Sequence, residues 1–158
     1  MILFDAFQQT RLYRDLVTKY GDMEPRERLA ELADLLDDYE ELPAAKETKF
    51  IWNYSIAISA RECGTPGCAL GLAVVNGMIP DFKHSQWGPH VQPAVLDTFA
   101  ISNREADELF GGGITRMMLS YGVDKASEVT PQMVAAKIRD FLGIEKTATQ
   151  PKPWDVVK

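Results

Sequence analysis

The fold is decided by residues 65–77, TPGCALGLAVVNG. Thr65 and Pro66 are typical of a helix start, as a cap and a first-turn proline, and Gly77 is a typical stop. Between them the apolar side chains lie nearly all round the predicted helix instead of along one stripe. A helix with this pattern has to be buried, so we expect it at the centre of the domain.

Segments on both sides of this central helix show apolar residues at helical spacing. Ser102 and Glu105 form a capping box, S-x-x-E, at the start of one of them, and Thr130 with Pro131 begins the clearest one. Gly21 and Gly143 are typical helix ends. The predicted outer helices cover residues 4–20, 25–43, 93–99, 102–110 and 130–142.

One segment changes period. In residues 49–59, KFIWNYSIAIS, large apolar side chains alternate with mostly smaller or polar ones, which is typical of a half-buried strand. A strand needs a partner, and the sequence offers residues 1–4, residues 114–119, or the same strand of a second subunit.

These elements together predict a mainly α, single compact helical domain over residues 1–143. We expect about five or six helices, with at most a small β element around residues 50–58. Residues 144–158 show no periodicity and are predicted to form a mobile C-terminal tail. The length of 158 residues, with 46% hydrophobic and 25% charged residues, suits one domain with a proper core.

The charge and hydropathy of the chain argue against nucleic acid and membranes as partners. A net charge of −6 and a sequence pI near 4.9 argue against direct binding of nucleic acid. No apolar run approaches the ~20 residues of a membrane span, and the first ten residues lack the basic region of a signal peptide. We therefore expect a cytoplasmic protein that does not contact membranes.

The most informative chemistry lies around Cys63 and Cys68, which flank Gly64, Thr65, Pro66 and Gly67. At the first turn of the central helix, backbone N–H groups would stabilise a Cys68 thiolate. Three interpretations stay open: two buried thiols in a structural turn capped by Thr65, a Cys63–Cys68 disulfide, or a catalytic Cys68. A catalytic thiol would need a base, for which the chain offers His84 and His90.

The same residues also have the types and order of a zinc site. Cys63, Cys68, His84 and His90 follow one another at the upper limit of finger-like spacing. The two histidines, however, fall in a segment rich in proline and glycine, whereas the histidines of a zinc finger lie on a helix. We therefore expect a structural cysteine turn, without a metal or other cofactor.

A second candidate surface is acidic. The outer face of the predicted helix 25–43 carries six carboxylates. Such a face is usually only solvated, but spaced carboxylates can also imitate a phosphate backbone. Residues 96–110 could form a helix-turn-helix, but the acidic second helix argues against DNA reading. The acidic face consists of Glu31, Asp34, Asp37, Asp38, Glu40 and Glu41.

The order of these segments resembles a family of uncharacterised bacterial and phage-encoded proteins. Its most specific element is the CGTxxCxxG core, present here as ECGTPGCALGLA at residues 62–73. The resemblance implies a shared helical fold centred on the cysteine turn, and it implies no reaction. The other matching elements are RLAELADLLDDYEELP at 28–43, FIW at 50–52, FAISNREADELFGG at 99–112 and TPQMVAAKIRDFL at 130–142.

Function is predicted mainly by which motifs the chain lacks. No phosphate loop, recognisable triad or paired-carboxylate signature is present. We expect a non-enzymatic, small acidic interaction protein, of the phage or prophage accessory or anti-defence kind, that acts through a protein partner. The alternatives are a thiol-dependent enzyme centred on Cys68 and an acidic nucleic-acid mimic. A homodimer is also compatible with the sequence.

Overall fold

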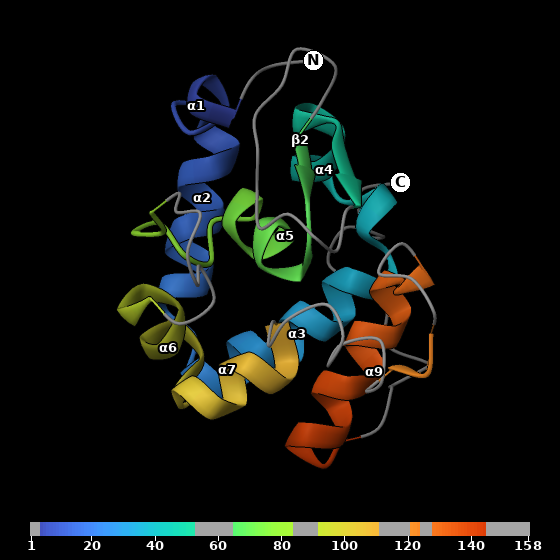
Figure 1. Cartoon of the computed structure of the whole chain (residues 1–158). Helices are drawn as coiled ribbons and strands as arrows, with labels where there is room; N and C mark the ends of the chain where they lie inside the picture. The colour runs from blue at the N-terminus through green and yellow to red at the C-terminus, as the bar shows by residue number, and fades with distance from the viewer. Residues whose placement is uncertain (1–3, 53–64, 84–91, 111–120, 124–127, 145–158) are drawn as a thin grey trace.

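The computed structural model describes residues 4–52, 65–83, 92–110, 121–123 and 128–144. Within these ranges the chain is mainly helical, which confirms the predicted fold class, and it includes two three-residue strands (Figure 1). The elements are α1 (Phe4–Phe7), α2 (Arg11–Gly21), α3 (Pro25–Asp37), η1 (Tyr39–Glu41), α4 (Pro43–Thr48), β1 (Phe50–Trp52), β2 (Thr65–Gly67), α5 (Ala69–Val75), α6 (Pro93–Phe99), α7 (Asn103–Phe110) and α9 (Pro131–Leu142).

The central helix is where the sequence predicts it. Every residue of α5 is buried, and in Figure 1 the helix lies between α2 on one side and β2 with α4 on the other. Gly77, which follows α5 with φ of 76°, lies against α2: an added Cβ would come within 2.9 Å of the backbone nitrogen of Val17. Glycine is therefore required both for the backbone angle and for this close approach.

The predicted core is largely confirmed. The apolar spacing of the sequence predicts twelve core side chains. The nine that are buried are Tyr13, Leu32, Leu36, Leu70, Val74, Phe99, Leu109, Val134 and Ile138. The other three, Leu16, Trp52 and Phe141, are only partly buried and pack against that core.

The predicted helix 4–20 is wrong in one respect, because it is two helices. Thr10 interrupts it: the Oγ1 of Thr10 accepts from the backbone N–H of Tyr13 at 3.2 Å and donates to the carbonyl of Phe7 at 2.7 Å. The side chain thus replaces helical hydrogen bonds at the end of α1 and caps α2.

The predicted helix 25–43 is also shorter than expected. α3 ends at Asp37, and the chain continues through the single turn η1 to α4, which begins at Pro43. Acidic residues at a helix C-terminus oppose the helix dipole, and this end of α3 has no basic residue in its last turn.

The strand partner was not among those expected. β1 pairs in parallel with β2, with Phe50 opposite Thr65 and Trp52 opposite Gly67. Thr65 therefore lies in a strand and does not cap the central helix; Cys68 occupies the N-cap position, without a side-chain capping bond. The rest of the predicted strand, from residue 53, lies outside the described residues.

The two predicted helix starts in the second half of the chain are confirmed. Ser102 and Glu105 exchange hydrogen bonds of 2.9 and 3.2 Å, and Thr130 accepts from the N–H of Met133 at 3.2 Å. Gly143 ends α9 in the left-handed conformation. The predicted C-terminal tail lies outside the described residues, apart from Ile144. None of the helices in the described ranges combines the length and apolar character needed to cross a bilayer.

Candidate functional site

Cys68 is buried in the core, with 6% of its surface exposed. Burial raises the pKa of the Cys68 thiol, although backbone N–H groups of α5, including that of Gly71, act in the opposite direction. Desolvation thus outweighs the stabilisation of a thiolate that the helix start would provide. A thiol of this kind stays protonated at neutral pH, which favours the interpretation of Cys68 as a structural side chain.

The remaining members of the cysteine and histidine set, Cys63, His84 and His90, lie outside the described residues. Both the zinc site and the thiol–histidine pairing therefore stay predictions. Among the residues that the structure describes, no three His, Cys, Asp or Glu side chains come together as metal ligands would.

The structure does add a local contact that the sequence did not reveal. The side-chain amide of Gln92 donates to the carbonyl of Lys83 at 2.7 Å, and the N–H of Lys83 donates to Gln92 Oε1 at 2.8 Å. This reciprocal pair joins the two residues that flank positions 84–91.

Two of the six acidic-face residues are used inside the fold. Arg139 on α9 donates to Asp34 Oδ1 at 2.8 Å and to Asp37 Oδ2 at 2.6 Å on α3. Only 8% of the Arg139 side chain and 5% of the Asp37 side chain are exposed. Burial opposes the charge of Arg139, but its hydrogen bonds to Asp37 and Asp34, with their negative charges, raise its pKa above the ordinary value.

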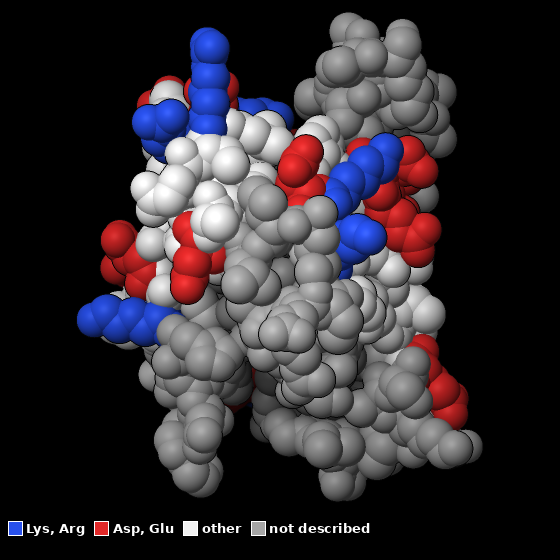
Figure 2. Space-filling model, turned by 90° about the horizontal axis from the view of Figure 1, so that it is seen from above, with Lys and Arg blue, Asp and Glu red and all other residues white. Residues whose placement is uncertain are grey.

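The other members of the acidic face are not a uniform charged surface. Glu31 and Asp38 are half-buried, whereas Glu40 and Glu41 are exposed, and Glu41 lies 3.6 Å from the ammonium of Lys46. Figure 2 shows that the described acidic side chains on the upper face are divided into separate small groups with basic side chains among them. On the face seen in Figure 2, the described carboxylates do not form the continuous line that would imitate a phosphate backbone.

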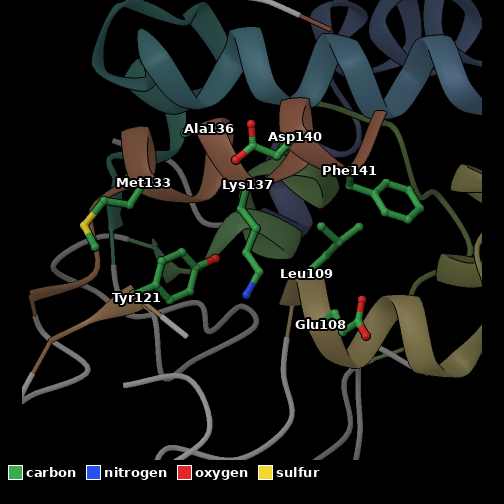
Figure 3. A pocket seen from close by; sticks show the side chains of 8 residues that line it. All are labelled: Glu108, Leu109, Tyr121, Met133, Ala136, Lys137, Asp140 and Phe141. Carbon is green, nitrogen blue, oxygen red and sulfur yellow. The ribbon is translucent and has the colours of Figure 1, made fainter. Parts of the chain in front are cut away.

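An opening that the described residues form lies between α7, α9 and Tyr121 (Figure 3). It is an open cavity of about 640 Å³, within the range of sites that hold small molecules or peptide side chains. Its lining combines apolar and charged groups: Glu108 and Leu109 from α7, Tyr121, and Met133, Ala136, Lys137, Asp140 and Phe141 from α9.

The sequence contains a signal for this face that was not recognised. The α9 residues that line the cavity recur at positions 133, 136, 137, 140 and 141, which is one face of a helix. Val134 and Ile138 on the same helix are fully buried. Helix α9 therefore has a core-facing side and a cavity-facing side, and only the first was expected.

Lys137 is the cation of the cavity. Its side chain extends from α9 toward Tyr121 and α7 (Figure 3), and its Nζ lies 4.6 Å from the centre of the Tyr121 ring. Partial burial lowers the pKa of Lys137, and the carboxylate of Glu108 acts in the opposite direction. The ammonium is thus partly desolvated.

Two carboxylates, those of Glu108 and Asp140, also line the cavity. Glu108 lies 3.6 Å from the Nε of Arg104, one helical turn away on the exposed surface of α7. The Asp140 side chain leaves α9 in a different direction from Lys137 (Figure 3). The lining of the cavity therefore combines one ammonium and two carboxylates with apolar side chains.

A smaller cavity of about 200 Å³ lies beside Arg28. The guanidinium of Arg28 donates to the carbonyls of Tyr20, Gly21 and Thr98 at 2.6, 3.2 and 3.0 Å. These bonds join the end of α2 to α3 and α6, so we assign Arg28 a structural role.

Comparisons of the chain with protein-family models, with curated proteins and with solved structures find no match. The candidate site therefore rests on its own geometry.

Proposed function

We propose that this chain is a non-enzymatic interaction protein that acts through a protein partner, with the cavity between α7 and α9 as its contact site. The observation that carries the proposal is an open cavity of about 640 Å³ whose lining combines apolar side chains with Lys137 and two carboxylates. Apolar pockets with a few polar groups are where proteins bind partner side chains and small ligands. An accessory or anti-defence role of the phage or prophage kind is part of this proposal.

The thiol-enzyme alternative has less support. Cys68 is buried, its pKa is raised, and it is not among the residues that line the cavity. The nucleic-acid mimic is also less well supported, because Asp34 and Asp37 of the acidic face bind Arg139 within the fold.

Co-purification with a pair of alanine variants tests the proposal. Ala136 is an exposed residue of α9 that lines the cavity, and Ala6 is an exposed residue of α1 that does not. We expect one stoichiometric protein partner to co-purify with the natural chain and with Ala6→Trp. Ala136→Trp should lose it, because the indole fills the contact site while circular dichroism shows an unchanged helical fold.

Retention of the partner by Ala136→Trp, or the absence of any stoichiometric partner, would contradict the proposal. A measured turnover that disappears in a folded Cys68→Ala variant would establish the enzyme alternative instead.

A further inference from the structure

We propose that Met133 is a site of reversible oxidation, at which a peroxide converts the thioether to the sulfoxide and so alters the start of α9. Two observations support this role of the side chain. Its sulfur is part of the cap of the helix, and the residue lines the open cavity between α7 and α9. The modification needs no protein partner, so it is separate from the proposed function.

The capping box at the start of α9 uses a sulfur atom. The backbone N–H of Thr130 donates to Sδ of Met133 at 3.4 Å, while the N–H of Met133 donates to Oγ1 of Thr130 at 3.2 Å. In the usual capping box this position carries Glu or Gln, as Glu105 does at the start of α7, where its carboxylate accepts from the N–H of Ser102 at 2.9 Å. A thioether is a weaker acceptor than a carboxylate, so the cap of α9 depends on the chemical state of the sulfur.

A small oxidant can reach Met133. The residue is partly exposed, and its hydrogen bond with Thr130 lies on the surface of the protein. By contrast, only 3% of Met78 is exposed, and this residue is part of the core. A buried sulfur reacts only when the structure opens around it, so we expect Met133 to be oxidised before Met78.

The sulfur and hydrogen peroxide balance the reaction between them. A lone pair of Sδ attacks one peroxide oxygen, so that an S–O bond forms while the O–O bond breaks. The proton on the transferred oxygen moves to the departing hydroxide, which leaves as water. The sulfur is oxidised by two electrons and the peroxide is reduced by two. Methionine sulfoxide reductases reverse the change.

Oxidation has to change the cap. At 3.4 Å no oxygen atom fits between Sδ and the backbone nitrogen of Thr130. The new oxygen therefore either uses the other lone pair of the sulfur, which then becomes electron-poor and accepts less well, or forces the side chain to turn away. Both outcomes alter the surroundings of the Thr130 N–H, and both replace an apolar side chain of the cavity with a polar one.

Treatment of the full chain with hydrogen peroxide tests the site. Trypsin separates Met23, Met78 and Met133 into three peptides, so mass spectrometry measures each sulfoxide by itself. We expect Met133 to be oxidised about tenfold faster than Met78, because the core has to open before Met78 can react. In nitrogen-15-labelled protein, the amide signal of Thr130 should move in step with the Met133 sulfoxide. Methionine sulfoxide reductases for both epimers should return the signal to its first position.

Two leucine variants assign the signal. Met133→Leu removes the sulfur and keeps most of the apolar volume, so the Thr130 amide of this variant should not respond to peroxide. Met23→Leu is the matched control, because Met23 is also half-buried but follows α2. Its Thr130 amide should respond as in the natural chain. Circular dichroism checks that both variants keep the helical fold.

Oxidation of Met78 at the same rate as Met133 would overturn the proposal. It would also be overturned by a Thr130 signal that stays in place when Met133 is oxidised, that responds equally in Met133→Leu, or that the reductases fail to restore.

Discussion

Helix α9 carries two cations, Arg139 and Lys137, in opposite environments. Arg139 is almost fully buried against α3, where it binds Asp34 and Asp37. Lys137, two residues earlier, extends into the open cavity beside Tyr121. Two residues correspond to about 200° around a helix, so the side chains leave from opposite sides.

The comparison separates a structural charge from a candidate functional one. Removing one member of a buried ion pair leaves the charge of the other member uncompensated. Arg139 therefore has to stay bound to Asp34 and Asp37 for α9 to pack on α3. A cation in an open cavity keeps contact with water and contributes little to stability. Lys137 is thus expected to matter less for the stability of the fold than Arg139.

The largest expected effect is that of Arg139→Met. This change leaves the buried carboxylate of Asp37 without its guanidinium, and we expect a loss of about 3–5 kcal/mol in the free energy of unfolding. Urea denaturation followed by circular dichroism measures it. Arg11→Met is the control, because 90% of that side chain is exposed; a similar loss in both variants would contradict the structural role of Arg139.

A smaller effect on stability is expected at the start of α9, where the Thr130 side chain caps the helix that carries both Arg139 and Lys137. Thr130→Ala removes the acceptor for the N–H of Met133 and should cost about 1 kcal/mol in the same denaturation experiment. Thr18→Ala is the matched control, since that exposed hydroxyl only donates to a carbonyl within α2 and its removal should be close to neutral. Equal losses would show that capping is not the cause.

The smallest effect on stability is expected for Lys137→Met, within about 0.5 kcal/mol of the natural chain at pH 7. The lowered pKa of Lys137 means that folding disfavours its charged form. The natural chain should therefore gain stability relative to the variant as pH rises from the folded pKa of Lys137 toward its ordinary value. Denaturation at several alkaline pH values checks this sign, and a relative loss over that interval would refute it.

Local rules account for the parts of the fold that were predicted correctly. The buried helix α5, the Ser102–Glu105 box and the Thr130 start are readable because capping and periodicity involve residues at most a few positions apart. The break at Thr10 was not predicted because the apolar spacing continues through it. Only the hydrogen bonds of the Thr10 side chain show that one helix ends there and the next begins.

The candidate site could be predicted only in part. The acidic residues of α3 were recognised as a face, but the partner of Asp34 and Asp37 lies more than 100 residues along the chain. The cavity-facing side of α9 mixes methionine, alanine, lysine and phenylalanine, so it does not stand out from an ordinary solvated face by composition.

The sequence by itself determined a mainly helical chain, the central helix and most of the core residues, because these depend on local propensity and on which side chains avoid water. Tertiary structure alone decided that β1 pairs with β2, that Arg139 binds the carboxylates of α3, and that Lys137 faces a cavity. The physical reason is that long-range pairing depends on how the helices pack against one another. Arg139 and Lys137 carry the same charge on the same helix, and only this packing places one in a buried cluster and the other in a cavity.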